Sequence, residues 1–142
     1  MPAMIVHHQH NDEFHLGLCE TVGVKGNPQQ ALARDLAMRQ WAGGVVVASF
    51  DALAFGDRQE KGGERFTFTR HLMKGNTLNG KYCYDVSCVI DFLADLPFVD
   101  PNKIGIMGHS LGGQMAIWAG VMDARLKVVV SSCGFSTLQA IQ

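Results

Sequence analysis

The sequence predicts an α/β fold, in which a parallel sheet carries helices on both faces. Apolar runs of strand length alternate with segments of helical spacing along the 142 residues; the strand candidates are Ala3–Val6, Val45–Ser49, Ile104–Met107 and Val128–Ser131. Parallel neighbours need a crossover connection, and helical segments lie between the strand candidates. The chain contains no internal repeat and no low-complexity tract, so a single domain over residues 1–142 is expected.

In the first half of the chain, the loop and the helix both carry clear signals. Residues 7–27 are polar and contain glycine, which predicts a loop after the first strand. Asn27 is then a good N-cap, Pro28 suits the first helical position, and Gly43-Gly44 end the helix. The apolar residues at helical spacing in between are Leu32, Leu36 and Trp41.

The second half continues the alternation. The stretch DALAFGDRQEKGGER, residues 51–65, is charged and predicts a solvated loop with surface ion pairs. A long amphipathic helix is expected from Thr77 to Leu96, then a turn at residues 100–102, and a further helix over Leu111–Val121 after the third strand. The apolar side of the long helix carries Tyr82, Val86, Val89, Ile90 and Leu93.

The composition narrows the possible function classes. The formal net charge is −1 and the charges are mixed, so no feature attracts nucleic acid or anionic lipid. The longest apolar runs fall far short of the ~20 residues that a membrane span needs, and the N-terminus lacks the features of a signal peptide. The cysteines have no metal-ligand spacing, which predicts reduced, mostly core thiols in a cytoplasmic protein. They are Cys19, Cys83, Cys88 and Cys133.

The stretch IGIMGHSLGG, residues 104–113, carries the chemistry. It contains the pattern G-x-S-x-G, as Gly108, Ser110 and Gly112, where a predicted strand stops and a helix begins. A tight strand-to-helix turn exposes the serine and needs small flanking residues. The helix N-terminus then directs the N–H of Leu111 at the oxyanion that forms when Ser110 attacks a carbonyl. The alternative is a glycine-rich loop that binds phosphate or only turns the chain.

With VDPNKIGIM before it, GHSLGG resembles the α/β-hydrolase fold family, in its dienelactone-hydrolase and acetyl-xylan-esterase-like branch. The resemblance includes the DALAFGDR segment and covers nearly all of the chain. It implies the front half of that fold, up to the strand after the nucleophile helix. It also implies a serine esterase or related acyl hydrolase, with a small-molecule ester as substrate and no cofactor.

The resemblance further implies a second oxyanion donor in the loop after the first strand. An HG-x motif is usual there, and His8-Gln9-His10 is its counterpart, so the backbone N–H of His10 is the expected donor. Gln9 departs from the usual glycine, and a residue with a side chain cannot adopt every conformation that glycine can. His7 and His15 are interpreted as polar loop residues.

A metal-dependent hydrolase is the alternative interpretation of the stretch HHQHNDEFH. His8, His10 and Asp12 match the front of the HxHxDH motif of metallo-β-lactamase-like hydrolases, but position 13 is glutamate. A catalytic zinc needs at least three protein ligands, and His71 and His109 have no clear ligand context. The intact serine motif favours the oxyanion-loop interpretation.

Neighbours of Ser110 are expected to support the turn rather than to act as base. His109 should pack or hydrogen-bond under the turn, because adjacent side chains on such a turn diverge. Met115 and Trp118, on the helix behind the serine, should lie in the core.

The base and acid of a catalytic triad are missing from the expected places. In this fold they follow the nucleophile in the order Ser, Asp or Glu, His. After Ser110 the sequence has Asp123 as its one acidic residue, too early in the chain, and no histidine. We therefore expect a partial gene product, truncated at both ends and inactive alone, whose open strand edges leave its oligomeric state undecided. A non-catalytic α/β binding module is the third interpretation.

Overall fold

A computed structural model of the chain describes residues 1–10, 12–24 and 35–136. Its strands form one parallel sheet in the order β2-β1-β3-β4. Their bounds are Ala3–His7 for β1, Val46–Ala48 for β2, Ile104–His109 for β3 and Leu126–Ser132 for β4. The predicted parallel sheet is confirmed, with each strand within two residues of its expected limits.

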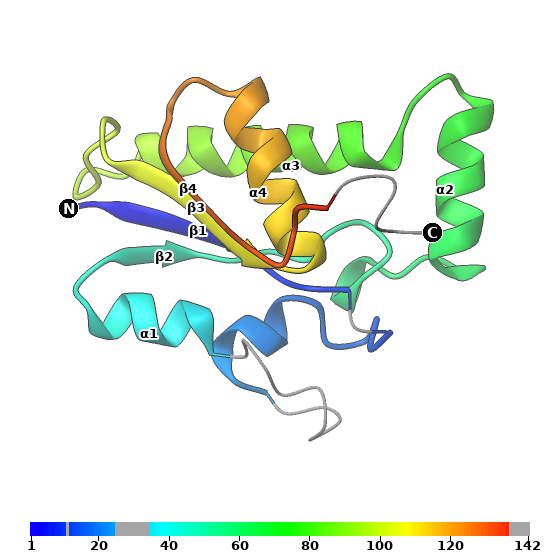
Figure 1. Ribbon diagram of the computed structural model, residues 1–142, viewed down its shortest axis with the longest axis horizontal. Helices are drawn as coiled ribbons and strands as arrows, with labels where there is room; N and C mark the ends of the chain where they lie inside the picture. The colour runs from blue at the N-terminus through cyan, green and yellow to red at the C-terminus, as the bar shows by residue number, and fades with distance from the viewer. Residues whose placement is uncertain (11, 25–34, 137–142) are drawn as a thin grey trace.

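Helices lie on both faces of the sheet, as expected (Figure 1). One helix, α1, covers one face, whereas α3 and α4 cover the other. A further helix, α2, lies beyond the carboxyl ends of the strands. The bounds are Leu36–Ala42 for α1, Gly63–Met73 for α2, Leu78–Ala94 for α3 and Leu111–Met122 for α4; the 3₁₀ helices η1 and η3 span Gly17–Val22 and Gly56–Arg58.

The long helix α3 is the element that the sequence predicted best. Thr77 is its N-cap, and its side chain accepts a hydrogen bond from the N–H of Gly80 at 3.0 Å. Its apolar stripe packs against the sheet, because residues three and four positions apart share one helix face. The buried members of this stripe are Leu78, Tyr82, Val86, Ile90 and Leu93.

The strand register sets the position of the candidate site. Residues of β1 pair with β3 so that Ile5 lies beside Ile106 and His7 lies beside Gly108. Ile5 and Ile106 are fully buried in the main core. Because parallel strands end at the same edge of the sheet, the loop after β1 and the turn after β3 emerge side by side.

Two predicted loops contain helical segments. The 3₁₀ helix η1 lies within residues 7–27, and η3 and the first residues of α2 lie within residues 51–65. Helix α2 has no apolar stripe, and Thr67 is its one buried residue, so its sequence carries no helical pattern. The predicted helix start at Asn27-Pro28 and the apolar position Leu32 lie outside the described residues.

The cysteines were expected mainly in the core, and this was wrong. Cys19, Cys88 and Cys133 are exposed, Cys83 is half-buried, and all four are free thiols. Thiol hydrophobicity alone does not decide which face of an element a residue occupies.

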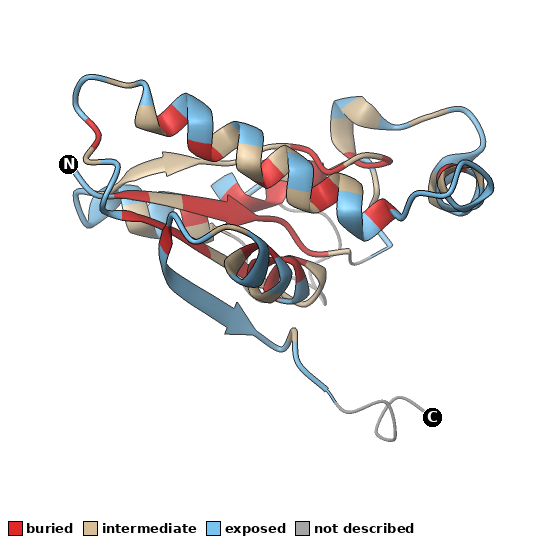
Figure 2. Cartoon of the chain, turned by 90° about the horizontal axis from the view of Figure 1, so that it is seen from above, coloured by how far each residue is buried: buried red, intermediate tan, exposed pale blue. Residues whose placement is uncertain are grey.

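Strand β4 is the exposed edge of the described sheet. Leu126 is its one buried residue, and Figure 2 shows the strand exposed along its length. Val128, Val129 and Val130 are 51%, 41% and 42% exposed. Within the described residues β4 pairs with β3 alone, so its other edge presents free backbone groups beside apolar side chains.

No helix in the described part of the chain is both long and apolar enough to span a bilayer.

Candidate active site

Ser110 occupies the turn between β3 and α4. Its backbone has φ 54° and ψ −116°, in a region that side-chain-bearing residues rarely adopt. The N–H of Ser110 donates to the carbonyl of Ser132 at 2.8 Å, and the carbonyl of Ser110 accepts from the N–H of Gln114 at 2.9 Å. The strained turn is therefore held between β4 and the first turn of α4.

The two glycines of the motif permit close backbone approaches. A Cβ atom on Gly108 would overlap the backbone of Gly112. A Cβ atom on Gly112 would overlap the carbonyl oxygen of His7 and lie 2.8 Å from that of His8. The Ser110 turn thus packs directly on the loop that follows β1, which only a glycine at position 112 allows.

That loop contains a buried histidine with a fixed tautomer. The Nδ1–H of His8 donates to the carbonyl of Gln9 at 2.8 Å, while the N–H of Ala52 donates to its Nε2 at 3.0 Å. Both ring nitrogens are therefore occupied, with the proton on Nδ1. Burial lowers the pKa of His8 to about 4, so the ring is neutral at pH 7.

His7 is also buried, which corrects its interpretation as a polar loop residue. It is the last residue of β1 and 1% exposed, with its ring edge-on to that of Phe50 at 5.3 Å between centroids. Its Nδ1–H donates to the carbonyl of His8 at 2.9 Å. Burial, with a smaller effect from His8, lowers the pKa of His7 to about 3.

These contacts set the direction of the His10 N–H. The carbonyl of Gln9 points at the His8 ring, and in a trans peptide the N–H of the next residue points the opposite way. The N–H of Gln9 donates to Oε1 of Glu20 at 2.6 Å. Gln9 does not have a positive φ, so its departure from glycine creates no backbone strain.

A cavity of about 540 Å³ brings the two ends of this arrangement together. Ser110, Leu111 and His10 all line it. Its other lining residues are Gln114, Ile117, Trp118, Cys133, Gly134, Phe135 and Ser136. The expected nucleophile and both expected oxyanion donors therefore belong to residues of one cavity.

Helix α2 contributes a residue that sequence reasoning missed. Glu64 lies with its Oε2 2.9 Å from Nε2 of His10. The His10 ring is also edge-on to Phe14 and Phe55, with centroids 4.9 and 5.6 Å away. Glu64 was expected in a solvated loop, and nothing in the pattern of residues 51–65 distinguishes it from its charged neighbours.

Arg58 in the same stretch is likewise half-buried, with its Nη1 2.9 Å from Oδ2 of Asp85.

The arrangement is unfavourable to the metal interpretation. His8 has both ring nitrogens in hydrogen bonds, and Nε2 of His10 is taken up by Glu64. The Asp12 side chain is 87% exposed and 3.4 Å from Nδ1 of His10. Across the described ranges, no three His, Cys, Asp or Glu side chains are grouped so that they could hold a metal ion.

His109 and Asp123 are both hydrogen-bonded to groups other than Ser110. Nδ1 of His109 lies 2.9 Å from Oγ of Ser132, so its ring is bonded to β4. Asp123 follows the last residue of α4, at the end of the helix opposite Ser110, and accepts from Nη2 of Arg125 at 2.7 Å. Hydrogen bonds from Arg125 lower the pKa of Asp123 to about 2, so it is ionised.

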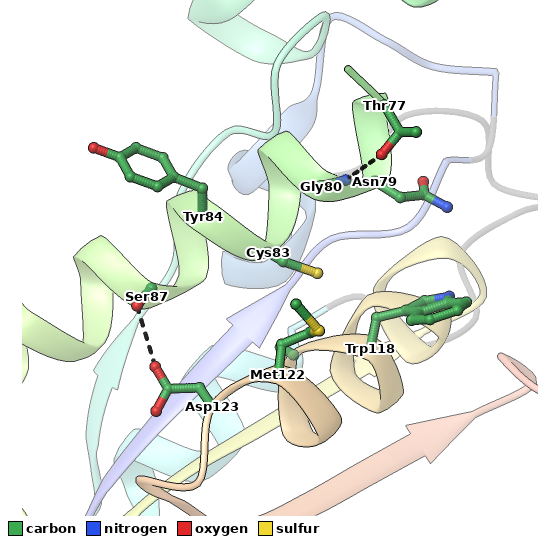
Figure 3. A pocket seen from close by; sticks show the side chains of 10 residues that line it. Thr77, Asn79, Gly80, Cys83, Tyr84, Ser87, Trp118, Met122 and Asp123 are labelled. Atoms are coloured by element: carbon green, nitrogen blue, oxygen red, sulfur yellow. Dashed lines mark hydrogen bonds between the residues drawn. The ribbon is translucent and has the colours of Figure 1, made fainter. Parts of the chain in front are cut away.

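A larger cavity, of about 590 Å³, lies between α3 and α4 (Figure 3). Cys83, Trp118 and Met122 give it an apolar lining, and the Ser87 hydroxyl bonds Asp123 at its edge. It contains neither Ser110 nor His10, so size alone does not identify the site.

Trp118 lines both cavities and is 48% exposed, which corrects its expected place in the core; Met115 is fully buried as expected.

The chain is similar to known proteins in sequence and in fold. The chain is 31% identical over 133 residues to YtaP of Bacillus subtilis (strain 168), whose name assigns it as a hydrolase; the match covers 93% of this chain and 43% of YtaP. A Bacteroides fragilis protein assigned as an acetyl xylan esterase superposes with a TM-score of 0.68 at 16% identity, over 89% of this chain and 35% of its own. For the acetyl xylan esterase from Paenibacillus sp. R4 the TM-score is 0.57 at 24% identity, over 89% and 37%.

The chain therefore spans less than half the length of these relatives. The sequence profile described as the prolyl oligopeptidase family matches residues 60–142, more than half of the chain and the part that includes the Ser110 turn. The α/β-hydrolase resemblance of the sequence is confirmed, and the chain belongs to the prolyl oligopeptidase family of α/β-hydrolases.

Proposed function

We propose that this chain carries the nucleophile and oxyanion hole of a serine hydrolase that acts on a small-molecule ester or related acyl substrate. One observation carries the proposal: Ser110 is held in a strained conformation at the wall of a cavity that His10 and Leu111 also line. Strain of this kind costs about 1–3 kcal/mol and persists where the surrounding structure enforces it, as is common at active sites.

The proposed reaction begins with attack of the Ser110 hydroxyl oxygen on the carbonyl carbon. A C–O bond forms, the carbonyl π electrons move to its oxygen, and the hydroxyl proton passes to a base. The tetrahedral intermediate then releases the alcohol, which takes up that proton. Water hydrolyses the remaining acyl-enzyme and returns the serine, with a carboxylic acid as the second product.

The oxyanion is the charge that the protein must stabilise. Leu111 is the first residue of α4, and the first N–H groups of a helix have no acceptor inside it. The helix N-terminus adds a partial positive charge. The His10 N–H, which points away from the His8 ring, is the proposed second donor. Removing one such donor costs about 10²–10³-fold in kcat in a well-studied serine protease.

The proton acceptor is proposed to lie in the whole protein, outside the residues of this chain. His109 and Asp123 are bonded elsewhere, and relatives such as YtaP are more than twice as long as the matched region. A histidine and an acidic residue would complete the triad there. The 142 residues alone are then expected to turn over ester substrates very slowly.

A fluorophosphonate probe tests the proposal directly, since the serine oxygen forms a P–O bond as fluoride leaves. The probe is applied to the 142-residue chain and to the protein translated from the longest reading frame that contains it. Mass spectrometry should find the adduct on Ser110, and Ser110→Ala should abolish it. Absence of a Ser110 adduct in both proteins would overturn the proposal in favour of a non-catalytic binding module. Stoichiometric zinc in the purified protein would instead favour the metal-dependent alternative.

A further inference from the structure

We infer that Glu20 is a positioning residue that aims the His10 N–H at the oxyanion, an inference that rests on the function proposed above. Glu20 lies in η1 and is 5% exposed, which is rare for a carboxylate. Its Oε1 accepts a hydrogen bond of 2.6 Å from the N–H of Gln9, the residue before His10.

Glu20 and His8 together hold Gln9 from both sides. Glu20 binds the N–H of Gln9, while the His8 ring binds its carbonyl. Holding the peptide groups on either side of a residue fixes its φ and ψ, which are the two soft dihedrals of the backbone. The peptide that carries the His10 N–H is therefore fixed in direction before any substrate arrives.

Backbone hydrogen bonds hold Glu20 and its helix η1 in place. The carbonyl of Glu20 accepts from the N–H groups of Gly23 and Asp35, at 3.1 Å each. The N–H of Leu18, in the same 3₁₀ helix, donates to Oδ1 of the buried Asp51 at 2.6 Å. Hydrogen bonds thus attach the helix η1 to the segment after β2, and Glu20 connects η1 to the loop after β1.

The chemistry makes this orientation matter. An oxyanion donor is useful when it lies 2.7–3.1 Å from the developing charge, and a misplacement of about 1 Å can cost about 10²-fold in rate. Without Glu20 the buried N–H of Gln9 would lose its acceptor, at a cost of about 1–3 kcal/mol, and the loop would turn to satisfy it. The His10 N–H would turn with it.

The test compares three variants: Glu20→Ala, Glu20→Gln and Thr21→Val. The quantity measured for each is the rate constant of Ser110 phosphonylation. Glutamine keeps an oxygen that can accept from Gln9, whereas alanine does not. Thr21 is the matched control, because it is 2% exposed in the same 3₁₀ helix and its hydroxyl bonds the Leu18 carbonyl and Ser49 rather than Gln9. Circular dichroism and thermal unfolding define the folded fraction of each variant, and rates are compared per folded molecule.

Glu20→Ala should label at least 10-fold more slowly than wild type, while Glu20→Gln recovers to within about threefold and Thr21→Val stays within about twofold. Where the longer protein turns over p-nitrophenyl acetate, Glu20→Ala should lower kcat and leave KM within about twofold, since a donor acts on the transition state. Equal rates in Glu20→Ala and Thr21→Val would overturn the positioning role. Failure of the wild-type protein to label at Ser110 would instead show that the proposed function itself is wrong.

Discussion

Gly112 and His7 lie so close that a Cβ atom on Gly112 would overlap the His7 carbonyl oxygen. This approach joins the turn that carries Ser110 to the loop that carries His10, although about a hundred residues separate them. The cavity beside Ser110 exists because two segments, distant in the chain, emerge from paired parallel strands.

Gly112→Ala should separate these two segments. The added methyl meets backbone atoms, which cannot rotate away as a side chain does, so we expect a loss of about 2–3 kcal/mol in the free energy of unfolding. Phosphonylation of Ser110 should slow by at least 10-fold. Urea unfolding measures the first quantity. Gly43→Ala is the control, since Gly43 has φ −80° and a Cβ there would lie 3.3 Å from the nearest atom. Equal stability losses in the two variants would contradict the account.

Ser110→Gly should be more stable than Ser110→Ala by about 1 kcal/mol. Glycine adopts a positive φ without the steric cost that alanine shares with serine, and this gain exceeds the larger entropy that glycine loses on folding. Both variants lack the hydroxyl, so neither should label. Thermal and urea unfolding of the pair give the comparison, and an alanine variant as stable as the glycine variant would show that the turn is not strained.

His10→Pro and His10→Ala separate the backbone of His10 from its side chain. Proline deletes the N–H, so labelling of Ser110 should fall by about 10²-fold or more. Alanine keeps the N–H and loses the contacts with Glu64 and Phe55, so it should retain at least about a tenth of the wild-type rate. Near-UV circular dichroism checks that both variants fold. If alanine proves as damaging as proline, the ring and not the N–H is the important group.

Acid should destabilise the fold through His7 and His8. Their folded pKa values, about 3 and about 4, lie below the ordinary value of 6.5, so the unfolded chain binds more protons between pH 6.5 and pH 4. Stability therefore falls as the pH falls through this window, with a slope of up to about 2.7 kcal/mol per pH unit where both take up a proton. Urea unfolding at pH 7, 6 and 5 measures it. His7→Phe should reduce the slope by about half, and an unchanged slope would contradict the assignment.

The exposed strand β4 should make the isolated chain self-associate. Its free edge and the half-exposed Val128, Val129 and Val130 offer a template for strand pairing. Val130→Lys places a charge on the face of this strand away from α4, because Val129 and Ser131 are the residues that contact α4 and side chains alternate along a strand. It should shift sedimentation velocity profiles toward the monomer at equal concentration. Lys127, already charged on the same strand, provides the control variant Lys127→Arg, which should change nothing. Wild-type protein that sediments as a monomer at every concentration would refute this expectation.

The elements with a strong local pattern could be predicted from the sequence. Helix α3 shows its apolar stripe at Tyr82, Val86, Ile90 and Leu93, and the Ser110 turn has its glycines between a strand and a helix. In both cases residues near in sequence determine the structure. The parallel sheet followed from the alternation of such elements.

The residues that complete the site could not be predicted, because their roles arise from contacts between distant segments. Glu20 gains its role from Gln9, and Glu64 from His10, and neither stands out in a polar stretch. His7 resembles its polar neighbours in sequence, yet it is the buried last residue of β1. Trp118 looked like a core residue because helical spacing does not reveal whether another element covers that face.

The most direct measurement is a crystal structure of the fluorophosphonate adduct. We predict a bond from phosphorus to the Ser110 oxygen, with the phosphoryl oxygen 2.7–3.1 Å from the backbone nitrogens of both Leu111 and His10. The Gln9 N–H should remain bonded to Glu20. A phosphoryl oxygen that faces away from both nitrogens, or an adduct on a residue other than Ser110, would contradict the central claim.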